Sequence, residues 1–239
     1  MKGEEERAPG VPHRRAIRSF VLRQGRMSPA QQRACDELLP KYGVAFAPQL
    51  LDFAQLFRRT APVVLEIGFG MGETTVAMAA ADPARDLIAV DVHTPGAGAL
   101  VRDVGALGLD NVRVVLGDAV QILRDRLAPG SVDEVRIFFP DPWPKSRHHK
   151  RRLIAPPFVG LLVDRMRVGG RLHCATDWAP YAQQILDVVR DEPGLANEHD
   201  GYAPRPAWRP VTRFERQGLA RGHQVFDVLA RTLPPPFRP

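Results

Sequence analysis

The chain contains only two cysteines among its 239 residues, Cys35 and Cys174. They lie far apart in the sequence, and neither has a partner histidine at the spacing of metal ligands. The sequence therefore predicts neither a disulfide framework nor a zinc site, and we expect no bound metal ion. A reducing compartment, the cytoplasm, is the natural location for such a chain.

Long apolar runs are also lacking. No uncharged stretch approaches the ~20 apolar residues that a membrane-spanning helix requires, and the N-terminus has no apolar signal-peptide core. We expect a soluble, unsecreted protein with no membrane partner. The 44% hydrophobic content and the absence of an internal repeat suit one good-sized α/β domain.

Acidic side chains are the minority charge. The formal net charge is +6, and three of the acids, Glu4, Glu5 and Glu6, lie at the extreme N-terminus, so the body of the chain is more basic than the total indicates. This balance implies a polyanionic partner, nucleic acid rather than membrane. Charge alone leaves open a generally basic soluble protein.

The composition divides the chain into four segments. Residues 1–12 are predicted to be a disordered leader, 13–61 a basic N-terminal arm and helix, 62–232 the main domain, and 233–239 a loose proline-rich tail. Several arginines in residues 13–26 indicate an arm that docks on RNA, although a solvated leader is equally compatible with them.

One helix of the arm segment has a clear start signal. Ser28 is a predicted N-cap, Pro29 occupies the first helical position, and Gln31 can close a capping box. The helix is expected to end before Pro40.

A strand, a glycine turn and a helix follow in residues 62–81. The apolar run 63–67 leads into Gly68-Phe69-Gly70-Met71-Gly72, and residues 74–81 are helix-compatible. Glu73 replaces the third glycine of the dinucleotide pattern G-x-G-x-x-G, which disfavours a nicotinamide-dependent oxidoreductase. The pattern G-x-G-x-G preceded by Glu66 looks instead like the cofactor loop of S-adenosylmethionine-dependent methyltransferases. A glycine turn by itself can equally be structural.

Further strand-like runs recur at residues 87–90, 112–116, 135–139 and 171–175, with helix-compatible stretches between them. The repetition predicts an α/β fold with a Rossmann-like, doubly wound, mostly parallel sheet. Residues 224–229 are the last strand candidate, which a methyltransferase fold would pair antiparallel near the edge.

An acidic residue lies at the end of each of the first four strands. These residues are Glu66, Asp91, Asp118 and Asp141. Because ligands of such folds bind beyond the carboxyl ends of the strands, we expect the four acids to share one site. Asp91 lies about 20 residues after the glycine loop, the spacing of an acid that holds ribose hydroxyls. Asp118 could instead only cap a helix.

The fourth strand stops at Pro140-Asp141-Pro142-Trp143-Pro144. Alternating prolines fix the backbone, so Asp141 and Trp143 are presented on a stiff turn. If the methyl acceptor is a ring nitrogen such as guanine N7, no proton has to be removed. Asp141 would then orient the base through its N–H groups and favour the developing positive charge. Trp143 and Trp178 either stack on a base or pack beside the rim.

A basic cluster follows this turn directly, with five cations, two histidines and no acid in eight positions. Its members are Lys145, Arg147, His148, His149, Lys150, Arg151 and Arg152. Such a cluster is expected to bind phosphates beside the site.

Two later segments leave alternatives open. Asp177 follows the fifth strand and either N-caps the next helix or contacts substrate. Thr212-Arg213-Phe214-Glu215 has the pattern of a capping box, and a substrate contact is the other interpretation.

Taken together, these motifs closely resemble the bacterial tRNA (guanine-N7-)-methyltransferase family over roughly residues 18–229. The matching blocks are residues 18–43, 66–72, 139–152, 176–178 and 212–215. The block from Phe139 to Arg152 is specific to the family, whereas the glycine loop is generic to methyltransferases. One departure is visible: Asp91 stands at the ribose position, where the family commonly has Glu.

The resemblance implies S-adenosylmethionine as cofactor, tRNA as partner, and methylation of N7 of a guanine in the variable region, conventionally position 46. It implies cofactor contacts from Glu66, Gly68, Gly70, Gly72, Asp91, Asp118 and Asp141, with Asp141 also the catalytic residue. Substrate contacts are implied for Lys145, Asp177, Thr212, Arg213, Phe214 and Glu215, and RNA binding for Arg147, His148, His149, Lys150, Arg151 and Arg152.

Two other classes of function are weighed against this one. A non-catalytic RNA-binding protein on the same fold would have a broken glycine loop or missing rim acids, and neither is seen. A methyltransferase for another base or for a small acidic metabolite is the other alternative, and the metabolite enzyme would not need the basic cluster. A monomer and a homodimer are equally compatible with the sequence.

Overall fold

The computed structural model describes residues 19–20, 25–45 and 47–234, with the side chains of Arg213 and Phe214 left aside. The predicted disordered leader, most of the basic arm and the end of the predicted loose tail lie outside these residues. Among the described residues, no helix is both long and apolar enough to cross a bilayer.

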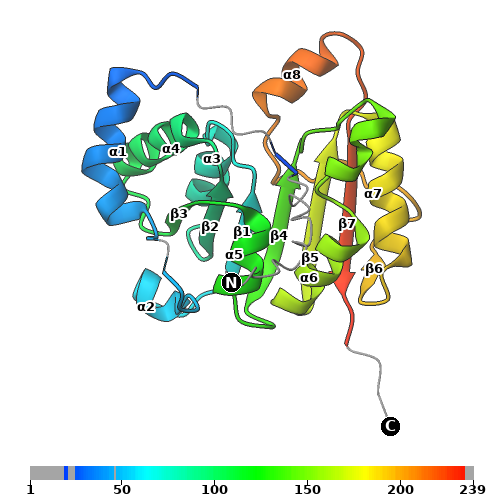
Figure 1. Cartoon of the computed structure of the whole chain (residues 1–239), viewed down its shortest axis with the longest axis horizontal. Coiled ribbons are helices and arrows are strands. Elements are labelled where there is room, and N and C mark those ends of the chain that lie inside the picture. The colour runs from blue at the N-terminus through cyan, green and yellow to red at the C-terminus, as the bar shows by residue number, and fades with distance from the viewer. Residues whose placement is uncertain (1–18, 21–24, 46, 235–239) are drawn as a thin grey trace, which may run out of the picture.

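Seven strands form one sheet, as the periodicity predicts (Figure 1). The strands are β1 (Val63–Ile67), β2 (Asp86–Asp91), β3 (Val112–Leu116), β4 (Val132–Phe138), β5 (Met166–Thr176), β6 (Leu195–Asn197) and β7 (Phe226–Thr232). Their order is β3-β2-β1-β4-β5-β7-β6. The first five strands pair in parallel, and β7 pairs antiparallel with both β5 and β6. The mostly parallel sheet with an antiparallel last strand is therefore confirmed.

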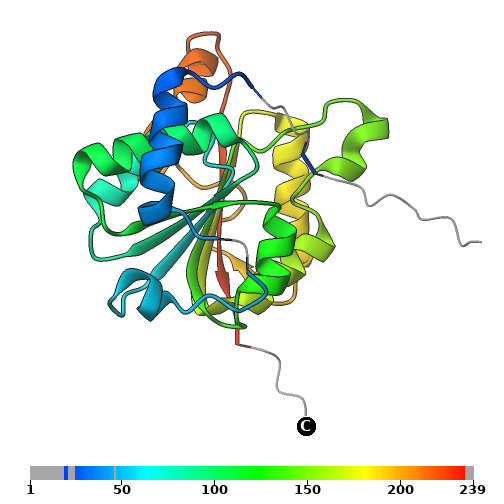
Figure 2. The same cartoon turned by 60° about the vertical axis from the view of Figure 1, so that its left-hand side comes forward.

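Helices cover both faces of the sheet. They are α1 (Pro29–Tyr42), α2 (Phe53–Phe57), α3 (Glu73–Ala81), α4 (Thr94–Leu107), α5 (Ala119–Arg126), α6 (Pro156–Arg165), α7 (Ala179–Asp191) and α8 (Arg213–Leu219), with a 3-10 helix η1 (Ser146–Arg151). The apolar side chains of α1, α3 and α4 form one core with the β1–β3 half, while α5, α6 and α7 build the larger core on the opposite face. Figure 2 shows these two helical layers with the sheet between them.

The N-terminal helix α1 packs tightly on α4. Two glycines of α4 allow this, because a Cβ at Gly98 would lie 2.6 Å from the backbone oxygen of Gln31, and one at Gly105 would lie 3.0 Å from Leu38 Cδ1. The Ser28–Gln31 capping box at the start of α1 is confirmed. The prediction that α1 ends before Pro40 is wrong: the helix continues to Tyr42, since a proline so near the C-terminus removes only one of the last hydrogen bonds.

The structure also extends and adds strands. β5 begins at Met166, five residues before the predicted start at 171, and includes Gly169 and Gly170. A short strand, β6, lies outside all of the strand-like runs that the sequence shows. β6 has only three residues and gains its strand geometry by pairing with β7, a contact that no local pattern reveals.

Candidate active site

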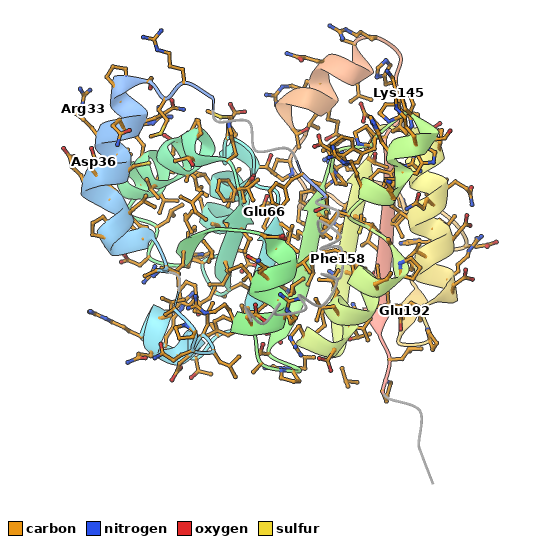
Figure 3. All side chains as sticks on the ribbon, viewed as in Figure 1. Arg33, Asp36, Glu66, Lys145, Phe158 and Glu192 are labelled. Atoms are coloured by element: carbon orange, nitrogen blue, oxygen red, sulfur yellow. The ribbon has the colours of Figure 1, made fainter. Side chains whose placement is uncertain are left out.

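The carboxyl ends of four neighbouring strands bring the four predicted acids together. Asp118 follows β3, Asp91 ends β2, Glu66 lies in β1 and Asp141 follows β4. A cavity of about 330 Å³ at this rim is lined by Asp91, Asp118 and Asp141 together with Gly68. A second cavity, of about 350 Å³, is lined by Glu66 and the glycine loop, and both cavities share Gly68, Phe138 and Phe139. Figure 3 labels Glu66 near the centre of the sheet and Lys145 at the upper right of the molecule.

The glycine loop between β1 and α3 contains three residues with positive φ. Gly68, Gly70 and Gly72 have φ angles of 85°, 58° and 83°, a region that side chains with a Cβ rarely adopt. A Cβ at Gly68 or Gly70 would meet no atom within 4 Å, so the space above these two residues is open to a ligand. Gly72 is the N-cap of α3, whose first amides face the same space.

Asp91 holds the glycine loop against the end of β2. Its Oδ2 accepts a hydrogen bond from the amide of Gly70 at 2.9 Å. Its Oδ1 accepts from the amides of Val92 at 2.7 Å and His93 at 3.0 Å. A carboxylate has about four lone-pair sites, so Asp91 keeps acceptor capacity for the ribose contact that the sequence predicts.

Glu66 is a buried carboxylate with an unused hydrogen-bond acceptor. Its side chain is 3% exposed, and Oε2 has no hydrogen-bond partner among the described residues. Burial raises the pKa of Glu66 to about 7, against the opposing positive charge of Arg136. A buried acceptor without a partner beside an open glycine loop fits a ligand that carries a positive charge or an N–H donor. S-Adenosylmethionine carries both, so the residues present fit this cofactor.

Strained backbone flanks Asp141. Three non-glycine residues in the described part of the chain have positive φ, and two of them are Phe139 (51°) and Trp143 (45°), on either side of Asp141. Each such residue costs on the order of 1–3 kcal/mol, and such strain collects at functional sites. The exposed Asp141 carboxylate thus lies on a stiff turn and lines the first cavity, as predicted.

Trp143 packs within the basic cluster, which supports the packing alternative over base stacking. Its indole Nε1 donates to the carbonyl of Ser19 at 3.3 Å, and the Arg151 guanidinium lies 4.7 Å from its ring centroid. His148 contacts the same ring edge to face at 5.9 Å. Partial burial and the neighbouring cations, Arg147 first among them, lower the pKa of His148.

The basic cluster is not uniform. Lys145, Arg147 and Lys150 are exposed, as RNA contacts require, and His149 is half-buried. Arg152, in contrast, is 5% exposed and its side chain points into the protein. The prediction that Arg152 binds RNA stays a prediction, but its burial argues against a phosphate contact.

Asp177 does not cap α7, so that alternative is wrong. The N-cap is Trp178, whose amide donates to Thr176 Oγ1 at 3.3 Å. Asp177 is exposed, and its Oδ2 lies 3.8 Å from Nδ1 of His223. Its carboxylate is therefore available to a substrate, as the other interpretation requires.

The capping box of Thr212 and Glu215 is confirmed at the start of α8. Thr212 also lines the second cavity. Glu215 is buried, and both of its oxygens are bonded to Arg209. The predicted substrate contacts of Arg213 and Phe214 involve side chains that lie outside the described part of the structure.

Several cavity-lining residues were not predicted from the sequence. Ser19, Phe20, His93 and Leu153 line the first cavity, and Gln217 of α8 lines the second. Phe20 stands out as an aromatic residue within the arginine-rich arm, which was a usable signal, whereas nothing in the sequence marks Gln217. Within the described residues, no group of three or more potential metal ligands occurs.

A mostly parallel sheet with this strand order and an antiparallel β7 is the fold of the class I S-adenosylmethionine-dependent methyltransferases. Of the solved structures that match, the 16S rRNA methyltransferase KamB has a TM-score of 0.56 and 18% identity, over 78% of this chain and 95% of that chain. A family model described as a putative methyltransferase matches residues 60–228.

Curated relatives narrow the class to one family. The tRNA (guanine-N(7)-)-methyltransferase of Nitrosospira multiformis is 57% identical over 220 residues, covering 92% of this chain and 96% of the relative. The protein of the same name from Methylobacillus flagellatus is 53% identical over 232 residues, covering 97% and 98%. The chain belongs to the tRNA (guanine-N7-)-methyltransferase family.

Proposed function

We propose that the protein transfers a methyl group from S-adenosylmethionine to N7 of a guanine in the variable region of tRNA, position 46. The observation that carries this proposal is the place of Asp141. Its carboxylate lies on a rigid turn that opens into the same cavity as Asp91 and Asp118, and the exposed cations of the basic cluster follow it directly.

Different rim residues would hold different parts of the cofactor. Asp91 and Asp118 line the cavity suited to the adenosine part, with Asp91 bonding the ribose hydroxyls. Glu66 and the glycine loop line the second cavity and suit the positively charged methionine part. When bound, the cofactor supplies an electrophilic methyl group on a sulfonium sulfur.

Asp141 orients the acceptor base and favours its positive charge. In the transfer, the N7 lone pair of guanine would form the new bond to the methyl carbon as the carbon–sulfur bond breaks, and the sulfur would leave as a neutral thioether. No proton is transferred, and the base becomes cationic. The interaction between the Asp141 carboxylate and the guanine N–H groups becomes more favourable as this positive charge develops on the base.

The surface around Asp141 suits a folded RNA. Lys145, Arg147, His149, Lys150 and Arg151 follow Asp141 in the chain, are exposed or half-buried, and suit the phosphates of the RNA. Asp177 offers an exposed carboxylate to the base and its ribose, and Thr212 lines the second cavity. Both residues would help to set the position of the guanine before transfer.

A product analysis tests the proposal. Purified protein is incubated with methyl-labelled S-adenosylmethionine and an unmodified tRNA transcript, and the labelled nucleoside is identified by mass spectrometry. The expected product is 7-methylguanosine, mapped to the variable region by borohydride and aniline cleavage. Label on an adenine or on another guanine atom would overturn the substrate assignment, and tRNA binding without transfer would favour a non-catalytic RNA-binding protein.

A further inference from the structure

Arg152 ends the basic cluster but differs from its neighbours in surroundings. Arg147 and Lys150 extend from η1 into solvent, whereas Arg152 is 5% exposed. A phosphate contact requires an accessible guanidinium, so burial removes Arg152 from the surface that meets RNA. Its conformation instead directs the side chain back towards the turn that carries Asp141.

Three contacts fix this side chain. Nε donates to the carbonyl of Pro142 at 2.9 Å, and Nη1 donates to Oε1 of Gln184 at 2.7 Å. The guanidinium also lies 4.9 Å from the ring centroid of Tyr181. Arginine is suited to this arrangement because its planar group can donate in two directions while stacking on an aromatic ring.

The two α7 residues that contact Arg152 are themselves held in place. Tyr181 is fully buried in α7, and its hydroxyl accepts a hydrogen bond from the Ile154 amide at 3.0 Å. Gln184, one turn further along α7, donates to the Ile154 carbonyl at 2.9 Å. The helix α7 therefore holds both Arg152 and the segment that follows it.

The other contact of Arg152 is with the strained turn that carries Asp141. The Pro142 carbonyl belongs to the residue between Asp141 and Trp143, and Trp143 has a φ of 45°. A backbone in such a sparsely populated region persists only when its surroundings determine it, and a charge-assisted hydrogen bond to the adjacent carbonyl supplies such a constraint.

We propose that Arg152 is a positioning residue that holds the Asp141 turn at a fixed place relative to the cofactor cavity, through the Pro142 carbonyl on one side and α7 on the other. It acts on the rate of transfer and not on the binding of tRNA. This inference rests on the proposed role of Asp141 in catalysis.

The test compares Arg152→Ala and Arg152→Lys with Arg151→Ala in the full-length protein. Both Arg152 variants are expected to lower kcat by about 10- to 100-fold, the cost of a displacement of ~1 Å at a reacting group. Their Kd values for tRNA and S-adenosylmethionine, and the slope of log affinity against log salt, are expected to match the wild type. Arg151→Ala is expected to weaken tRNA binding and to reduce the magnitude of that slope by about 1, the share of a single neutralised phosphate.

A reduced salt slope in Arg152→Ala would overturn the proposal, because it would make Arg152 a phosphate ligand. An unchanged kcat in Arg152→Lys would overturn it too. If Arg152→Ala does not fold, as judged by thermal unfolding, Arg152→Lys and Gln184→Ala carry the test, and Gln184→Ala is expected to lower kcat by a smaller factor. Asp141→Asn is measured in parallel: full activity there would refute the catalytic role of Asp141, whereas its inactivity beside wild-type rates in the Arg152 variants would refute only the positioning role.

Discussion

The guanidinium of Arg209 binds the carboxylate of Glu215 through two hydrogen bonds, Nη1–Oε2 at 2.6 Å and Nη2–Oε1 at 2.9 Å, and both side chains are buried. The same guanidinium donates to both carboxylate oxygens of Asp227 in β7, at 2.9 and 3.0 Å. Asp227 in turn lies 2.6 Å from Nε2 of His173 in β5. Helix α8, which lies above the sheet in Figure 1 and contributes residues to the wall of the second cavity, is thus fixed to the sheet through Arg209.

Replacing Arg209 with alanine leaves two buried carboxylates without their cation. We expect Arg209→Ala to lower the free energy of unfolding by about 3–5 kcal/mol, the cost of breaking a buried ion pair from one side. Urea unfolding measures it. The control is Arg216→Ala, because Arg216 is exposed on the same helix, and it should change stability by no more than about 0.5 kcal/mol. Equal destabilisation of the two variants would show that burial of the pair is not what stabilises α8.

Glu66 should make the cofactor-free protein less stable as pH rises. Its pKa is about 7 in the folded protein against an ordinary value of 4.5, so between these two values the folded state binds the proton more strongly than the unfolded state. The unfolding free energy therefore falls as pH rises through this window. Urea unfolding at pH 5 and pH 8 is expected to show this fall in the wild type and a smaller fall in Glu66→Gln. An identical pH dependence in both proteins would contradict the raised pKa.

Asp91 is expected to support cofactor binding partly by holding the glycine loop in place. Asp91→Asn replaces one acceptor oxygen with a donor that faces backbone amides, and an unsatisfied buried donor costs about 1–3 kcal/mol. The Kd for S-adenosylmethionine, measured by isothermal titration, should rise by about 10-fold or more. Asp103→Asn is the control, since Asp103 lies in α4 and pairs with its neighbour Arg102. A wild-type Kd in Asp91→Asn would remove Asp91 from the cofactor site.

A methyl group at position 96, in α4, should displace the glycine loop that packs against this helix. A Cβ there would lie 1.8 Å from the carbonyl oxygen of Gly70, a backbone atom that cannot give way alone. Gly96→Ala is expected to weaken cofactor binding by about 10-fold, given overpacking costs of about 1–3 kcal/mol. Isothermal titration checks it.

Gly160→Ala is the matched control for that substitution. Gly160 lies inside α6, and a Cβ there would meet its nearest atom at an ordinary 3.7 Å. This variant should bind the cofactor normally and gain about 0.5–1 kcal/mol of stability. Normal cofactor binding in Gly96→Ala as well would show that the loop can move away from α4 without harm to the site.

The exposed part of the basic cluster should set the salt dependence of tRNA binding. Replacing Arg147 and Lys150 together with alanine is expected to reduce the slope of log affinity against log salt by up to ~2, about 1 for each phosphate that these side chains neutralise. Filter binding at several salt concentrations measures the slope. Arg124→Ala, an exposed change on α5 in a pair with Asp125, should leave it unchanged. A wild-type slope in the double variant would show that the cluster is solvated surface that does not contact tRNA phosphates.

The sequence by itself determined the features that depend on local chemistry and chain order. Glycine permits the positive φ found at Gly68, Gly70 and Gly72, and the capping boxes at Ser28 and Thr212 follow from side chains three positions apart. The meeting of the rim acids follows from strand order, because parallel strands joined by helices place all their carboxyl ends at one edge. The family resemblance added the nature of the substrate, which residue spacing alone did not contain.

Only the tertiary structure decided which of these side chains are free to act. Arg151 and Arg152 are adjacent and chemically identical, yet one lies over Trp143 and the other is buried against α7. The Glu215 oxygens are occupied because Arg209 reaches them from outside the helix. Exposure and partner choice depend on residues that are distant in sequence, because the packing of separate elements against one another sets them.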